Sequence, residues 1–290
     1  MINLLDGSNL VNISYFSFIR FLEDKNGKGY VPTILDIGFY IHLFFQKVKQ
    51  FYEICPKNIF CLEGKNSTSW RKSIYPQYKA NRHADENPQY KLIGKAYELS
   101  EELLSYLPGL VFSVENCEAD DIIYALSKYL SMKGEKIKIV STDKDLVQIM
   151  NYFENCSVYD PVKNEFRQRN KNILFEKAVC GDNSDNIKGV KGIGPKTLEK
   201  MLADNKVWSE VMTKHNGQEE YEKCMKIVDL KQFPYTKNIV KEYISKQWNE
   251  MNKEKLFNFF DKYNLVKCKE MVEQETLSRL AALNNTIGLL

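Results

Sequence analysis

Carboxylates stand at the ends of three short, mostly apolar runs of the sequence. The runs and the acids that follow them are 2–5 with Asp6, 59–62 with Glu63, and 137–142 with Asp143, beyond which comes Asp145. Apolar runs of this length that end in a charge are typical of the strands of a parallel sheet. Because the ligands of an open α/β sheet bind outside the carboxyl ends of its strands, acids far apart in the sequence would converge there.

Converging carboxylates need a positive partner. Two of them about 4 Å apart repel by about 4 kcal/mol at an effective dielectric near 20, and a divalent cation removes this cost. Oxygen ligands suit hard cations, above all Mg²⁺ with Mn²⁺ as a substitute, and two such ions about 4 Å apart can hydrolyse phosphodiesters. The alternative is that each acid only ends a strand or caps a helix, which is the better interpretation for any single one.

Two further acidic segments enlarge the set of candidate metal ligands. Glu118, Asp120 and Asp121 open an apolar helix, and the segment 181–186 supplies Asp182 and Asp185. The helix macrodipole favours acids in a first turn, but three acids in four positions exceed what capping requires. Both segments therefore belong with the strand-end acids.

The composition is that of a globular protein without disulfides, zinc or a membrane span. Its seven cysteines are scattered without a Cys-x-x-Cys pair, and its three histidines show no ligand spacing. No apolar run reaches the roughly 18 residues that a membrane span needs, and no signal peptide is visible, so we expect a cytoplasmic protein, in the host cytoplasm if the origin is viral. A net charge of +3 combines acidic clusters with basic stretches, as expected when a polyanion approaches a metal site.

The spacing of apolar residues predicts an α/β fold, with a central, mostly parallel sheet flanked by helices. Helices are expected at 32–52, near 96–107, from 118 through 130 and at 146–150, and further strands at 58–63, 110–114 and within 156–167. From 198 onward the pattern is helical and rich in Lys, Trp and Tyr. We divide the chain into an N-terminal α/β domain, 1–180, and a helical C-terminal region, 181–290.

Basic and aromatic residues are interleaved in the segment 64–95. Tyrosines stack unpaired bases at roughly 1–3 kcal/mol each, while lysines neutralise phosphates. Composition alone favours a solvated loop. The position of the segment, between two strands that end near the acids, favours nucleic-acid binding instead.

Glycines in the segment 189–196 predict a tight hairpin followed by a helix. Glycine permits positive φ, and Pro195 suits the first position of a helix. The free N–H groups of that helix would bind a phosphate beside a lysine, as in a helix-hairpin-helix that contacts the nucleic-acid backbone without reading bases. The predicted DNA-binding residues are Gly189, Gly192, Ile193, Gly194, Lys196 and Thr197.

Four motifs follow one another along residues 5–197. They are Leu5-Asp6-Gly7-Ser8-Asn9, Glu118-Ala119-Asp120-Asp121, Ser141-Thr142-Asp143-Lys144-Asp145, and Gly181-Asp182-Asn183-Ser184-Asp185-Asn186 with the hairpin through Lys196. In this order they resemble the 5′ nuclease (flap endonuclease) family, above all the free-standing phage and bacterial 5′→3′ exonucleases and the nuclease domain of bacterial DNA polymerase I. The resemblance implies a PIN-like fold with a helical arch at about 64–100 and a C-terminal helix-hairpin-helix region.

The resemblance also implies a role for each acid. The family's metal-site acids match Asp6, Glu118, Asp120, Asp121, Asp143, Asp145, Asp182 and Asp185. One Mg²⁺ would lie among Glu118, Asp120 and Asp143, with Asp6 close by, and the second would lie among Asp145, Asp182 and Asp185. Glu63 departs from the family, which usually has Asp there, so a water-mediated contact is expected. The family's hairpin also binds K⁺, which adds a K⁺ site as a further expectation.

The stretch 70–82 resembles the base of the family's arch, through or under which a single-stranded 5′ arm passes. Lys79 and Arg82 are the first candidates to contact the scissile phosphate and offset the charge that develops on it, and Arg71 and Tyr78 rank next.

These features predict a monomeric, two-metal 5′ nuclease. It would remove 5′ flaps and 5′-terminal nucleotides from branched or nicked DNA in replication or repair, with RNA–DNA hybrids as further substrates and replication proteins as partners. One ion would lower the pKa of its water and the other would stabilise the departing 3′ oxygen. Two alternatives stay open. A PIN-type ribonuclease lacks the 181–196 block, and a catalytically silent DNA-junction binding protein is disfavoured by the complete set of aspartates.

Overall fold

A six-stranded sheet forms the centre of the protein. The computed structural model describes residues 1–52, 57–82, 87–203, 209, 213 and 217–273. The strands are β1 (Ile2–Asp6), β2 (Asn58–Cys61), β3 (Leu110–Phe112), β4 (Ile137–Val140), β5 (Cys156–Asp160) and β6 (Glu165–Phe166). Their order is β3-β2-β1-β4-β5-β6, with parallel neighbours through β5 and an antiparallel edge strand β6. The predicted mostly parallel sheet is confirmed.

The strands contribute side chains to two separate apolar cores. Successive side chains of a strand point to opposite faces, so Leu5 and Phe60 lie in one core while Leu4 and Ile59 lie in the other. Every residue of β1, β2 and β4 is buried. Both faces of the sheet must therefore be covered, which explains the unbroken apolar runs in the sequence.

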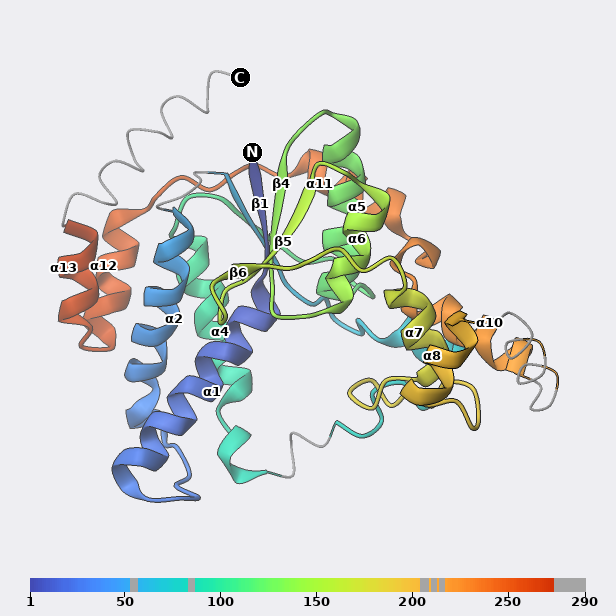
Figure 1. Ribbon diagram of the computed structural model, residues 1–290. Helices are drawn as coiled ribbons and strands as arrows, with labels where there is room; N and C mark the ends of the chain where they lie inside the picture. Colours follow the sequence, from blue (N-terminus) through green and yellow to red (C-terminus); the bar gives the residue numbers. More distant parts are fainter. Residues whose placement is uncertain (53–56, 83–86, 204–208, 210–212, 214–216, 274–290) are drawn as a thin grey trace.

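Helices α1 (Gly7–Asn26), α2 (Ile37–Tyr52) and α4 (Ile93–Ser105) cover the first face (Figure 1). Apolar residues of α1 recur at helical spacing and are buried, among them Leu10 and Phe18. α2 begins later than the predicted residue 32, because a 3₁₀ turn, η1 (Ile34–Asp36), comes first. In that turn the carboxylate of Asp36 accepts hydrogen bonds from the N–H and the hydroxyl of Thr33.

The second face is covered by α5 (Ala119–Met132), α6 (Ile149–Tyr152) and α11 (Thr236–Ser245), together with the 3₁₀ turns η4 (Asp145–Gln148) and η5 (Leu230–Gln232). α5 follows the predicted boundary closely, since Glu118 is its N-cap. The predicted helix at 146–150 is divided between η4 and α6.

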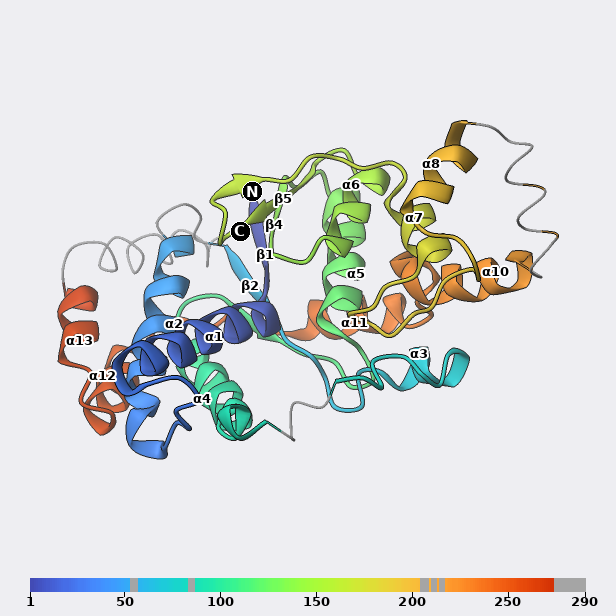
Figure 2. The same ribbon diagram turned by 60° about the horizontal axis from the view of Figure 1, so that its bottom comes forward.

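A helical unit stands at one end of the sheet (Figure 2). It contains α3 (Ser69–Ile74), α7 (Ile173–Cys180), α8 (Pro195–Ala203) and α10 (Gly217–Val228). Two small apolar clusters hold it together, and one of them includes Tyr75 and Tyr78 from the predicted arch base. The predicted arch segment, 64–100, contains α3, a 3₁₀ turn η3 (Pro88–Tyr90) and the start of α4, and its residues 83–86 lie outside the described residues.

The C-terminal third returns to the sheet. Phe259 and Phe260 of α12 (Lys253–Lys262) and Cys268 of α13 (Val266–Glu273) are buried in the core formed by α1 and α2. Phe233 and Ile239 join the opposite core. Burying one such aromatic side chain stabilises a fold by about 1.5–3 kcal/mol, so residues 230–273 contribute substantially to both faces. The boundary at residue 180 stays a prediction, but the helices beyond it complete the core of the segment before it.

No helix within the described ranges has both the length and the apolar character needed to span a bilayer. The six cysteines in the same ranges are free thiols, as the scattered spacing predicts.

Candidate active site

Neighbouring parallel strands bring the first acids to one edge of the sheet. β1 pairs with β2 on one side and with β4 on the other, so the chain order reverses at β1, which is where ligands of such sheets bind. The hydroxyl of Ser141 donates to Asp6 Oδ2 (2.8 Å) and accepts from the N–H of Asp143 (3.0 Å). Ser141 therefore fixes the two predicted metal ligands relative to each other, a role that sequence reasoning missed.

Asp6 also starts α1. Its side chain accepts from the N–H of Asn9 (2.9 Å), which is the usual N-cap arrangement. Asn9 in turn accepts from the N–H of Thr142 (3.0 Å) and donates to its hydroxyl (2.8 Å). The start of α1 and the loop after β4 are thus joined directly beside the acids.

A buried arginine holds two acids at the start of α5. Arg71 donates to Glu118 Oε2 (2.6 Å), to both oxygens of Asp121 (2.6 and 2.9 Å), and to the carbonyl of Ile227 (3.1 Å). The three charged side chains are at most 4 % exposed. Buried charges are expensive unless they are paired and hydrogen-bonded, and both conditions are met here.

This network changes the roles that the sequence predicts for Arg71 and Asp121. The sequence places Arg71 near the scissile phosphate and Asp121 among the metal ligands. In the structure their charged groups face each other in the interior, and Asp121 has no exposed surface. The geometry favours a positioning role for both, in which they orient Glu118.

Glu118 has two further partners from the loop after α3. The hydroxyl of Tyr78 donates to Oε2 (3.0 Å), and Lys79 Nζ forms an ion pair with Oε1. Burial alone would raise the pKa of Glu118, but the charges of Arg71 and Lys79 outweigh it and hold the pKa below its usual value. Lys79 has a φ of 55°, a left-handed conformation that is uncommon for lysine and is often found at functional sites. Two predicted catalytic residues thus contact a predicted metal ligand.

Three aspartates form a second acid group around Lys177 of α7. One oxygen from each of Asp145, Asp182 and Asp185 lies within 4.8 Å of the others. Lys177 Nζ lies 2.8 Å from Asp182 Oδ2 and 3.5 Å from Asp185 Oδ2, and also forms an ion pair with Asp145. Arg82 pairs with Asp185 (3.0 Å). Sequence reasoning missed Lys177, although its place in the last turn before Gly181 was an available signal.

The acids of the first group have no such partner. We define this group as Asp6, Asp120 and Asp143, which the ion pairs among the described residues leave without a basic side chain. Burial raises the pKa of Asp6 to about 7, and nearby Asp143 and Glu63 add to the shift. Burial, Asp143 and Asp6 raise the pKa of Asp120 well above its usual value, although the charge of Lys79 acts in the opposite direction. A cation among these oxygens would offset the repulsion between the carboxylates and the cost of burying them in their charged form. Carboxylate oxygens are also the ligands that Mg²⁺ and Mn²⁺ prefer.

The pKa values within the second acid group diverge. Burial raises the pKa of Asp145 to about 6 despite the charge of Lys177. Burial also acts on Asp182, but Lys177 and Ser184 outweigh it and lower that pKa to about 2. Lys177 stays charged, because Asp145 and Asp185 raise its pKa against the opposing effect of burial.

Glu63 is exposed and lies at the margin of the site. Its carboxylate accepts from the hydroxyl of Ser67 (3.2 Å), and its N–H donates to Ser8 Oγ (3.2 Å). This marginal place agrees with the expectation of an indirect contact, which stays a prediction.

The predicted arch base is joined to the loop that carries the second acid group. Three of the hydrogen bonds between them end on backbone carbonyls. They run from the Lys79 N–H to the Asp185 carbonyl (2.9 Å), from Asn81 Nδ2 to the Asn183 carbonyl (2.7 Å), and from Asn186 Nδ2 to the Gln77 carbonyl (2.6 Å). The loops 75–82 and 181–189 therefore form one structural unit.

Helices α7 and α8 form the predicted helix-hairpin-helix. The N–H of Val190 donates to the carbonyl of Val179 (2.8 Å), which folds the hairpin back on α7. Gly189 has a φ of 66°, and an added Cβ would lie 2.3 Å from the backbone nitrogen of Gly181, so this position requires glycine. Pro195 is the first residue of α8, as predicted.

The predicted DNA-binding residues differ in exposure. Gly192 and Lys196 are exposed, Gly194 and Thr197 are half-buried, and Gly189 and Ile193 are buried. Ile193 belongs to the apolar cluster of the hairpin. The buried members shape the hairpin, and the exposed ones are free to meet a phosphate. Their binding of DNA stays a prediction.

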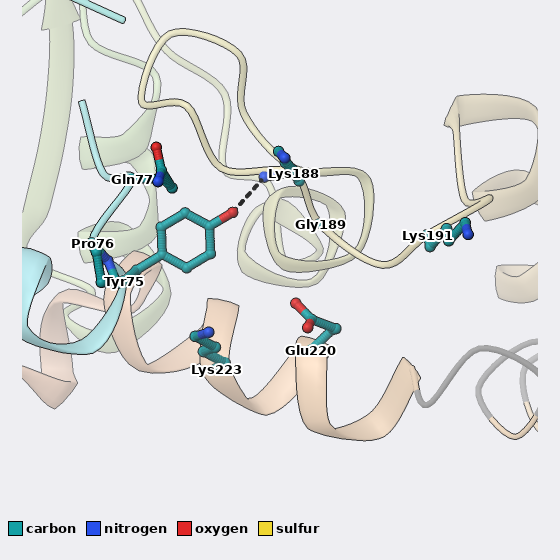
Figure 3. A pocket seen from close by; sticks show the side chains of 8 residues that line it. All are labelled: Tyr75, Pro76, Gln77, Lys188, Gly189, Lys191, Glu220 and Lys223. Carbon is teal, nitrogen blue, oxygen red and sulfur yellow. Dashed lines mark hydrogen bonds between the residues drawn. The ribbon is translucent and has the colours of Figure 1, made fainter. Parts of the chain in front are cut away.

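A cavity of about 610 Å³ lies between the loop after α3, the hairpin and α10. Lys188, Lys191, Lys223 and Glu220 line it, and the ring of Tyr75 forms one wall (Figure 3). The hydroxyl of Tyr75 accepts from the N–H of Lys188 (3.3 Å), and Lys223 Nζ lies 5.4 Å from the ring centre. Three lysines against one glutamate give this cavity the charge that a nucleic-acid backbone requires.

Comparisons with known proteins agree with the geometry. The family described as 5'-3' exonuclease, N-terminal resolvase-like domain, matches residues 1–179. A 5'-3' exonuclease of Buchnera aphidicola subsp. Schizaphis graminum is 31% identical over 234 residues, which cover 75% of this chain and 74% of the relative. One of Aquifex aeolicus is 32% identical over 212 residues, which cover 69% and 68%. DNA polymerase I of Bacillus subtilis is 28% identical over 217 residues, which span 23% of its length.

Solved structures show the same fold. T5 D15 protein co-crystallized with metal ions matches with a TM-score of 0.61 at 17% identity, covering 91% of this chain and 98% of the other. The catalytic core of Rad2 in complex with DNA substrate matches with a TM-score of 0.51 at 17% identity, covering 93% and 90%. The predicted PIN-like fold and the predicted family are confirmed. With its motifs gathered at the carboxyl edge of the sheet, the chain belongs to the 5'-3' exonuclease family.

Proposed function

We propose that the protein is a Mg²⁺-dependent 5′ nuclease that hydrolyses phosphodiester bonds of branched or nicked DNA. The observation that carries this proposal is the convergence of acids from β1, α5, the loop after β4 and the loop after α7 beside two lysines and a helix-hairpin-helix. Acids that only end strands or cap helices would not be expected to pair with basic residues more than 100 positions away, as Asp185 does with Arg82.

Both acid groups would bind divalent ions, and among the described residues Asp145, Asp182 and Asp185 are the group whose oxygens lie within 4.8 Å of one another. Asp6, Asp120 and Asp143 would hold one ion with Glu118, while Asp145, Asp182 and Asp185 would hold the other. When bound, such a pair supplies a water made more acidic and a positive charge beside the departing 3′ oxygen. Mn²⁺ is the expected substitute for Mg²⁺.

The chain's own residues would bind and orient the substrate. Lys79 and Arg82 sit at the joined loops, where their charges can meet the scissile phosphate and offset the charge that develops on it. The hairpin with Lys196, and the lysine-lined cavity beside it, would hold the duplex backbone without reading its sequence. The distance between this duplex-binding surface and the two acid groups would then determine which phosphodiester bond is cleaved.

Solved neighbours support DNA as the substrate. One is a bacteriophage T5 D15 flap endonuclease in complex with DNA and metal ions, and the Rad2 core was solved with DNA substrate. We propose that the substrates include 5′ flaps, 5′ termini at nicks and RNA–DNA hybrids. We also propose that a K⁺ ion binds at the hairpin, and that the protein acts as a cytoplasmic monomer together with replication proteins.

A 5′-labelled flapped duplex tests the proposal. The purified protein is incubated with it in Mg²⁺, in Mn²⁺ and in EDTA, and the product lengths are read on a denaturing gel. We expect short 5′ products with either ion and none in EDTA. Tight binding without cutting would instead support the silent junction-binding alternative, and preferential cutting of single-stranded RNA would support the PIN-type ribonuclease.

A further inference from the structure

Lys177 occupies the centre of the second acid group. It projects from α7, its side chain is 10% exposed, and its ammonium group contacts an oxygen from each of three aspartates. The same three carboxylates are the group that could hold a metal ion among the described residues. An ammonium group and a divalent ion would therefore compete for the same oxygens.

The charges make this competition strong. Lys177 and Arg82 supply two positive charges against three carboxylates, so one negative charge stays unbalanced. A divalent ion added beside both basic side chains would reverse the sign of the group. If the ion replaced Lys177, the three carboxylates, Arg82 and the ion would have a net charge of zero. The exchange takes place at contact distance, where charge–charge energies are largest.

The first acid group lacks this competitor. Asp6, Asp120 and Asp143 take part in no ion pair of the described residues, although Glu118 beside them pairs with Arg71 and Lys79. In the second group, by contrast, all three carboxylates contact the single ammonium group of Lys177. The two metal sites of the proposed function are therefore unequal before any substrate arrives.

We propose that Lys177 is a built-in cation that keeps the second metal site closed, so that a second ion binds only after Lys177 leaves the aspartates. This inference rests on the proposed function, because it assumes that both acid groups bind divalent ions. The exchange breaks no covalent bond and moves no proton, since the charged ammonium group swings away on its flexible stem. Metal binding is then ordered, with the first acid group filled before the second.

Mn²⁺ binding to the DNA-free protein tests the proposal without relying on cleavage. Calorimetry and electron paramagnetic resonance would count the bound ions and measure their affinities in four forms of the full chain. These are the wild type, Lys177→Met, Lys177→Arg and the control Lys171→Met, which removes an exposed lysine near the start of the same helix. We expect one tighter and one weaker ion in the wild type, and about tenfold or greater tightening of the weaker one in Lys177→Met alone.

The other variants sharpen the result. Lys177→Arg keeps the charge and should bind like the wild type, and Asp185→Asn added to Lys177→Met should abolish the gain. Unchanged stoichiometry and affinity in Lys177→Met, or an equal gain in Lys171→Met, would overturn the proposal.

Thermal unfolding gives an independent measurement if Lys177→Met is unstable. Without the lysine, the aspartates repel one another, so Mn²⁺ should raise the midpoint of this variant more than that of the wild type. An equal rise in both would also count against the proposal. Should Mn²⁺ bind as expected while flapped DNA stays intact, the proposed function fails and the competition at Lys177 stands.

Discussion

Replacing Arg71 with methionine tests whether this arginine holds the start of α5. Methionine keeps much of the apolar stem but leaves Asp121 buried without its partner, while Glu118 retains Tyr78 and Lys79. Removing one member of a buried ion pair costs about 3–5 kcal/mol, and the unmet carbonyl of Ile227 adds about 1 kcal/mol. We expect the free energy of unfolding to fall by roughly 4–6 kcal/mol.

The loss should depend on pH. Burial already raises the pKa of Asp121 despite Arg71, so without Arg71 the folded-state pKa rises further. A carboxyl group with a raised folded-state pKa destabilises the folded state as pH rises from the unfolded-state pKa, about 4, toward the folded-state value. The stability difference between wild type and Arg71→Met should therefore be smaller at pH 5 than at pH 8. Urea denaturation followed by circular dichroism at both pH values measures it.

Two further variants complete this test. Lys72→Met replaces a basic residue with methionine at the exposed neighbouring position and should change the free energy of unfolding by no more than about 0.5 kcal/mol. Adding Asp121→Asn to Arg71→Met should recover part of the loss, because it removes the unpaired charge. A loss below about 1 kcal/mol, or one that is equal at both pH values, would refute the assignment of Arg71 as the residue that holds Glu118 and Asp121.

Three other changes probe the site and the hairpin. Asp143→Asn should lower cleavage of a flapped duplex by more than about 100-fold while leaving DNA binding and the unfolding midpoint nearly unchanged, and wild-type turnover would exclude Asp143 from the metal site. Lys196→Ala should weaken duplex binding alike across sequences and reduce the slope of log K against log salt by about 1, whereas an unaltered slope would argue against a phosphate contact. Gly189→Ala should destabilise the fold by at least about 2 kcal/mol in urea titrations, because its Cβ would meet backbone 2.3 Å away, and Gly94→Ala, with nothing within 4 Å, should be neutral or stabilising.

Strand positions and the acids behind them could be predicted because both depend on local pattern. A fully buried parallel strand needs a short apolar run, and the chain must leave the sheet where that run ends. Strand lengths were harder to predict, since β2 stops at Cys61 although the apolar run continues through Leu62. Leu62 is buried and its N–H still donates to the carbonyl of Phe112 (2.9 Å). The apolar run therefore marks the buried residues, which extend beyond the regular strand.

The pattern did not predict α1. The residues after Asp6 are Gly7, Ser8 and Asn9, which favour turns over helix interiors, and no element was predicted there. Its helical spacing of buried residues from Leu10 to Leu22 was an available signal. Asp6 offsets the weak start by capping it, which gives one carboxylate both a structural and a predicted catalytic part.

The partners of the acids could not be predicted from spacing. Arg71 lies 50 positions from Asp121, and Lys177 lies 32 positions from Asp145, so only the packing of α3 and α7 beside α5 and η4 brings them together. A basic residue in a nucleic-acid-binding chain suggests a phosphate contact, and the structure shows that the three predicted ones, Arg71, Lys79 and Arg82, also pair with carboxylates.

The return of α11, α12 and α13 to the sheet also bears on how the protein is made. When only the first 230 residues have left the ribosome, Phe45 still lacks Phe260, its edge-to-face neighbour in the folded protein. Both faces of the sheet that carries the acids stay partly uncovered until residues 230–273 have folded onto them. A chain assembled in this order acquires its stable form only after residues 230–273 have left the ribosome.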